Sequence, residues 1–159
     1  MNSTTEQHEE YIHLESSIDD LNRAWIILNE ILKPTIGLLV ISAFQFAIIE
    51  YAKPYLKARG KLRDYKLDDS CVPSEHKNLH QKLLKMRNTI IAHSDLTIRD
   101  AHLHVVDMPS GRFVGTAQNV IVAWEEISNI ETIIDLIERT LECLYKREQR
   151  LKVDLPTTR

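Results

Sequence analysis

The chain of 159 residues contains 43% hydrophobic and 27% charged residues, the composition of an ordinary globular protein. Its formal net charge of −3 excludes a surface that is basic throughout, so any nucleic-acid site must be a local patch. Only four glycines and five prolines interrupt the chain, which favours long helices over a β fold with many turns. A chain of this length is expected to form one domain over residues 1–159, and the scarcity of glycine and proline favours an all-α fold. We expect loose ends at 1–8 and 154–159.

Apolar residues recur at helical spacing in four segments, which predicts a bundle of about four long helices. We expect these helices over about 9–33, 34–59, 74–93 and 120–153. Pro54 should kink or interrupt the second helix because it lacks an amide donor, and Gly60 should end it. Ser74, directly after Pro73, is expected to cap the first amide groups of the third helix.

Residues 35–49 form a nearly continuous apolar stretch. It is about five residues shorter than the roughly 20 that a membrane span requires, and Ser42 and Gln45 interrupt it. We therefore interpret it as a helix buried on most sides, in its own core and against a partner subunit if the chain dimerises. No membrane segment is expected.

A small β-hairpin insertion is predicted over about 101–115. Two short runs with β-branched and alternating character flank Pro109, Ser110 and Gly111, which form a turn signal. Because an isolated two-stranded hairpin is only marginally stable, we expect it to pack against the helices.

The two cysteines, Cys71 and Cys143, lie far apart in the sequence, without the spacing of a metal site or a redox motif. We therefore expect reduced thiols and a cytoplasmic location. The polar and acidic segment 1–10 does not resemble a signal peptide.

Three polar residues stand among apolar ones toward the end of the third predicted helix: Arg87, Asn88 and, after four further residues, His93. A guanidinium, an amide and an imidazole are groups that bind a phosphodiester and move a proton without a metal. The Arg87-Asn88-x4-His93 pattern resembles the defining motif of the HEPN superfamily. The wider wording RNTIIAHSD is most similar to the abortive-infection-associated branch.

This resemblance implies a small helical homodimer that acts as a metal-independent endoribonuclease, as the toxin or effector of a toxin–antitoxin or abortive-infection system. An RNA substrate, a cognate antitoxin protein and no cofactor or metal would follow. His93 would act as the general base or acid, Arg87 would stabilise charge on the phosphate, and Asn88 would orient either group. Asp95 could fix the His93 ring or serve only as a local cap.

Arg87 and His93 are six positions apart, which on a regular helix means about 120° of rotation and about 9 Å of rise. They therefore share a site only if the helix unwinds near His93 or if a dimer brings both motifs into one cleft, and the resemblance implies the dimer. Two alternatives remain open. Arg87 could pair with a carboxylate while His93 caps its helix, or the domain could be catalytically silent and bind a protein partner or nucleic acid.

A basic segment over 51–66 supplies candidate RNA contacts outside the motif, because cations pair with phosphates and tyrosines can stack on bases. The alternative is a solvated helix end whose cations favour the helix dipole. The RNA-binding candidates are Lys53, Lys57, Arg59, Lys61 and Arg63, interleaved with Tyr51, Tyr55 and Tyr65.

His76 and His80, four residues apart on one helix, have a spacing that can bind zinc. The HExxH arrangement is absent, and no further ligand completes the set. We interpret them as a solvent-facing pair.

Overall fold

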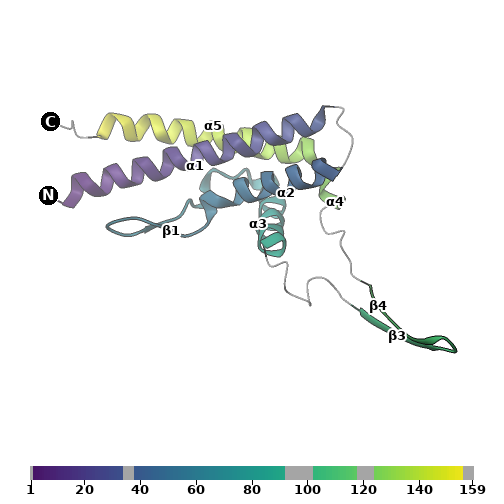
Figure 1. Ribbon diagram of the computed structural model, residues 1–159. Coiled ribbons are helices and arrows are strands. Elements are labelled where there is room, and N and C mark those ends of the chain that lie inside the picture. The colour runs from purple at the N-terminus through teal and green to yellow at the C-terminus, as the bar shows by residue number, and fades with distance from the viewer. Residues whose placement is uncertain (1, 34–37, 92–101, 118–123, 156–159) are drawn as a thin grey trace.

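The computed structural model describes residues 2–33, 38–91, 102–117 and 124–155 (Figure 1). It is mainly helical with a small antiparallel hairpin, which confirms the mainly-α prediction. Four long helices form the body, namely α1 (Asn2–Leu32), α2 (Leu38–Ala52), α3 (Lys77–Ile91) and α5 (Ile130–Asp154). The shorter elements are the helix α4 (Trp124–Ile127), the 3-10 turns η1 (Lys53–Tyr55), η2 (Asp69–Cys71) and η3 (Ser74–His76), and the strands β1 (Ala58–Arg59), β2 (Asp64–Tyr65), β3 (His102–Met108) and β4 (Gly111–Ala117).

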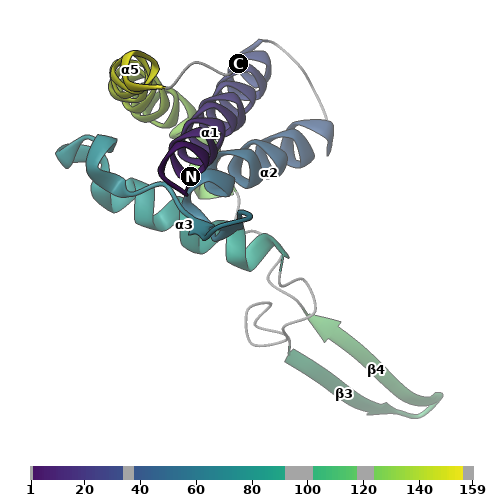
Figure 2. The ribbon, with the colours of Figure 1, turned by 90° about the vertical axis from the view of Figure 1, so that its left-hand side faces the viewer.

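Helix α1 is central to the body: it packs against α2 on one side and α5 on the other, while α3 packs across α2 (Figures 1 and 2). Its apolar stripe repeats at three- and four-residue intervals, so one face is turned continuously toward the core. The largest fully buried apolar side chains come from all four long helices: Leu21, Leu28, Phe44, Ile48, Tyr51, Leu83, Ile133, Leu136, Ile137 and Leu144. None of the described helices combines the length and apolar composition needed to cross a bilayer.

The second helix is shorter than predicted. It ends at Ala52, and Pro54 lies in η1, so the expected interruption at the proline is confirmed and the expected continuation to residue 59 is wrong. The chain instead forms β1 and β2, a two-residue antiparallel ladder. Gly60 makes this tight turn possible, because a Cβ there would lie 2.6 Å from the Arg63 carbonyl oxygen.

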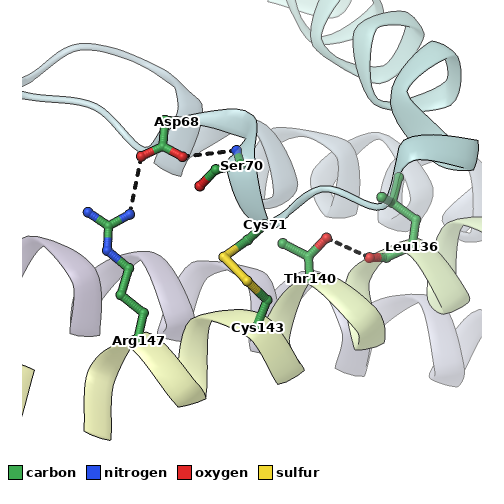
Figure 3. The surroundings of a disulfide bond; sticks show 7 residues. All are labelled: Asp68, Ser70, Cys71, Leu136, Thr140, Cys143 and Arg147. Atoms are coloured by element: carbon green, nitrogen blue, oxygen red, sulfur yellow. Dashed lines mark hydrogen bonds and ion pairs between the residues drawn. A yellow bond between two sulfur atoms is a disulfide. The ribbon is translucent and has the colours of Figure 1, made fainter. Parts of the chain in front are cut away.

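A disulfide between Cys71 of η2 and Cys143 of α5, with a Cα–Cα distance of 5.4 Å, ties the segment before α3 to the last helix (Figure 3). The expectation of two reduced thiols is therefore wrong. Residues separated by 72 positions become neighbours only through the tertiary fold, which short-range cysteine spacing cannot reveal. Because disulfides are rare in reducing cytosol, the bond removes one basis for the cytoplasmic prediction.

The predicted hairpin is confirmed, with Val105 opposite Val114 in an antiparallel register. Its packing is not as expected, since the hairpin projects away from the helices (Figures 1 and 2). Both of its faces expose apolar side chains, with Leu103 65% exposed on one and Phe113 57% exposed on the other. The described helices therefore do not supply the cover that a two-stranded sheet needs.

Candidate functional site at the end of α3

Helix α3 positions the candidate motif because its buried face, which includes Leu83 four residues before Arg87, is held in the core. Leu83 and Met86 are buried, and an ion pair joins Lys82 to the buried Glu126 of α4. The start of the helix differs from the expectation: the Ser74 hydroxyl donates to the Glu75 carboxylate at 3.2 Å, and no side chain caps the first amides of η3.

Arg87 and Asn88 occupy the penultimate turn of α3, and Arg87 is half-buried while Asn88 is exposed. Nη1 of Arg87 donates a hydrogen bond to Oδ1 of Asn88 at 3.1 Å. The buried Nε of Arg87 has no acceptor within the described ranges, and no carboxylate there forms an ion pair with the guanidinium. The alternative in which Arg87 pairs with a carboxylate thus has no support in the described part of the chain.

The Arg87 guanidinium, with a donor that no described residue accepts from, is suited to binding an anion. Its fork of N–H donors matches two oxygens of a phosphate, and a buried donor without an acceptor costs about 1–3 kcal/mol until a partner arrives. Asn88 holds one donor of the fork in place and keeps its own amide group at the surface. The pair can therefore accept an oxyanion without first breaking an ion pair to any described residue.

His93 and Asp95 lie outside the described residues. The described part of helix α3 extends through Ile91, two positions before His93 in the sequence. The proposed roles of His93 and Asp95 remain predictions.

The basic segment 51–66 is more neutralised than the sequence indicated. Lys53 pairs with Glu50, Lys57 with Asp64 at 2.6 Å, and Arg63 with Glu6 at 3.3 Å. Arg59 is exposed and has no ion-pair partner among the described residues, whereas the Lys61 amide donates to Glu9.

The tyrosines of this segment are not available for base stacking. Tyr51 is 0% exposed, Tyr55 is 3% exposed and Tyr65 is 7% exposed. RNA binding by this segment remains a prediction that depends mainly on Arg59 and Lys61.

His80 is a buried core residue, 1% exposed, and not half of a solvent-facing pair. Its Nδ1 lies 2.7 Å from the Tyr51 hydroxyl oxygen. Its ring packs edge-on against the Tyr55 ring, with 4.5 Å between the two ring centroids. Burial lowers the pKa of His80 from its ordinary value, which favours the neutral ring. His76 separately contacts Asp135 at 2.6 Å.

The two histidines therefore do not converge. Within the ranges that the structure describes, no three His, Cys, Asp or Glu side chains are placed to hold a metal ion. No short-range pattern in the sequence reveals the Tyr51–His80 contact, because the partners are 29 positions apart on different helices.

The motif is thus represented in the structure by its Arg87–Asn88 half, on a well-packed helix and with an available guanidinium. Comparison of the chain with protein-family models, curated proteins and solved structures yields no match.

Proposed function

We propose that the chain is a metal-independent endoribonuclease of the HEPN type, acting as a homodimer and serving as the toxin or effector of a toxin–antitoxin or abortive-infection system. The observation that carries this proposal is Arg87, whose guanidinium contacts Asn88 and keeps a buried donor without an acceptor among the described residues. The motif resemblance supplies the reaction class, and His93 is its other essential group.

In the proposed reaction, His93 removes the proton from a ribose 2′-hydroxyl, and the 2′-oxygen attacks the adjacent phosphorus. The bond from phosphorus to the 5′-oxygen breaks, and the leaving 5′-oxygen takes a proton from the imidazolium of His93. Arg87 stabilises the charge that gathers on the non-bridging phosphate oxygens, and Asn88 orients the guanidinium. The products are a 2′,3′-cyclic phosphate and a 5′-hydroxyl.

A homodimer is supported by apolar side chains left in solvent on the outer surface of the bundle. On α2, Leu39 is 78% exposed and Phe46 is 50% exposed, and a separation of seven residues places both on one helix face. On α1, Ile26 is 52% exposed. A second copy that covers these residues would remove their apolar surface from water.

The proposal is tested with purified protein and a panel of single-stranded and structured RNAs in EDTA. We expect the wild type to cleave, and we expect both Arg87→Ala and His93→Ala to slow cleavage by about a hundredfold or more. Lys77→Ala is the matched control, because Lys77 is an exposed cation at the start of the same helix. Cleavage that persists equally in both motif variants would contradict the proposal.

The second candidate is a catalytically silent domain of the same type that binds a partner protein. The β3–β4 hairpin favours it, because its exposed apolar side chains lie on both faces and call for a covering surface. The antitoxin of the first candidate could supply that cover equally well. The RNA assay separates the two functions, since a silent domain leaves every RNA intact.

A further inference from the structure

An open cleft of about 720 Å³ lies between α5 and the segment that leads into α3. Its floor carries the Cys71–Cys143 disulfide (Figure 3). The lining of the cleft contains four cationic side chains and only two carboxylates, those of Asp68 and Glu142. This local excess of positive charge contrasts with the negative net charge of the chain. The four cations are Arg139, Lys146, Arg147 and Arg150.

Two of these cations are available to a ligand. Among the described residues, neither Lys146 nor Arg150 has an ion-pair partner, and both are exposed. Arg147 donates to Asp68 at 3.2 Å, and Arg139 contacts Glu75. The positive potential of the cleft therefore comes chiefly from the Lys146–Arg150 end.

The wall opposite α5 is held in position. Asp68 accepts hydrogen bonds from the Ser70 amide at 2.9 Å and from Arg147 (Figure 3). The Ser70 side chain, the Ser70 amide and Arg147 together lower the pKa of the Asp68 carboxyl group. The disulfide fixes η2 to α5 one turn before Arg147. The cleft is thus preformed, so a ligand would not have to order it.

We infer that this cleft binds a linear chain of phosphates, such as the backbone of a single-stranded nucleic acid, without reading bases. On α5 the cations recur at 139, 146 and 150, which spreads them over about 16 Å of helix along one side. A single phosphate group would reach only one end of that row. Successive phosphates on a strand can meet Lys146 and Arg150 directly. A phosphate at Arg139, in contrast, would compete with Glu75 for the guanidinium.

The remaining lining agrees with backbone recognition. The described cleft contains no aromatic side chain, so it offers no platform on which a base could stack. Arginine and lysine contacts to phosphates position a strand but carry no sequence information. This inference does not depend on the Arg87–His93 chemistry, since binding at the cleft requires no cleavage.

The test is fluorescence anisotropy with a labelled 2′-O-methyl oligouridine, which lacks the 2′-hydroxyl that the proposed reaction needs. Disulfide-bonded wild type is compared with the Lys146→Ala/Arg150→Ala variant over a range of salt concentrations. We expect about tenfold or greater loss of affinity at about 50 mM salt. The plot of log affinity against log salt should become less steep by about 1.4, the change expected when two phosphate contacts to a single strand are lost.

The matched control is Lys33→Ala/Lys77→Ala, which removes the same charge from exposed positions directly after α1 and at the start of α3, outside the cleft. Retained affinity in this control supports the cleft, whereas equal loss in both variants, or no loss in the cleft variant, would overturn the inference. Labelled oligoadenosine should bind as tightly as oligouridine, and a strong base preference would also overturn it. Competition by inorganic polyphosphate and by unlabelled RNA distinguishes the two sources of a phosphate chain.

Discussion

Arg87 combines two properties that rarely occur together in a structural arginine: a buried donor without an acceptor and no carboxylate partner within the described chain. A guanidinium kept for packing would normally be satisfied, because leaving a buried donor unpaired is costly. Within the described residues, the fold therefore gives no structural reason for a polar side chain at this position.

This distinction predicts the effect of Arg87→Met. The methionine fills similar space and removes the unpaired donor, so the free energy of unfolding should change by less than about 1 kcal/mol while RNA cleavage is lost. Urea unfolding and the EDTA cleavage assay measure the two quantities. A large loss of stability would instead identify Arg87 as part of the framework.

His80 predicts a pH dependence of stability. Burial lowers its pKa in the fold below 6.5, so the unfolded chain gains a proton near pH 6.5 that the folded chain does not, and the free energy of unfolding falls as the pH drops. His80→Asn keeps an acceptor for the Tyr51 hydroxyl but cannot titrate. We expect its loss of stability between about pH 7.5 and about pH 5.5 to be smaller than in the wild type.

Urea unfolding at several pH values checks this prediction. His13, whose pKa burial also lowers, should leave the variant with part of the slope. Identical slopes in the two proteins would show that His80 does not contribute.

At this scale the sequence identified residue types but not their surroundings. Arg87 and Asn88 stood out because polar groups interrupt an apolar face, and the structure brings them together as neighbours on one helix. His80 was misjudged because burial depends on Tyr51 and Tyr55, which reach it from another part of the chain.

At the scale of elements, the disulfide is the main covalent constraint between η2 and α5. The bond joins residues 72 positions apart and so lowers the conformational entropy of the unfolded chain. This effect is expected to raise the free energy of unfolding by about 4 kcal/mol. We therefore expect reduction to lower the urea midpoint of the wild type strongly.

The matched control for reduction is Cys71→Ser/Cys143→Ser, which should unfold near the reduced wild type and should not respond to reductant. A wild-type curve that reductant leaves unchanged would show that the bond does not form in solution.

The long helices were predictable because apolar residues recur every three or four positions within each helix, a pattern visible in a short stretch of sequence. The β1–β2 turn was not, since strands of two residues are too short to show alternation. The packing of the β3–β4 hairpin was also predicted wrongly, because its turn residues specify the hairpin but not what covers it.

At the scale of the whole molecule, the apolar surface of α2 predicts self-association. Sedimentation equilibrium should give twice the chain mass of 18.4 kDa for the wild type. Leu39→Glu/Phe46→Glu places charges on that surface and should yield monomer. Val153→Glu is the matched control, because Val153 is 84% exposed at the far end of α5 (Figure 1). A wild-type monomer would contradict the dimer.

The proposed function is one reaction that requires a ribose 2′-hydroxyl and no metal. The most direct test uses an RNA cleaved by the wild type in EDTA and its counterpart with a single 2′-deoxy substitution at the mapped cleavage site. We predict that cleavage at this site disappears from the substituted RNA, and that the unsubstituted RNA yields a 2′,3′-cyclic phosphate and a 5′-hydroxyl. Continued cleavage at the deoxy position, or products bearing a 5′-phosphate, would contradict the account.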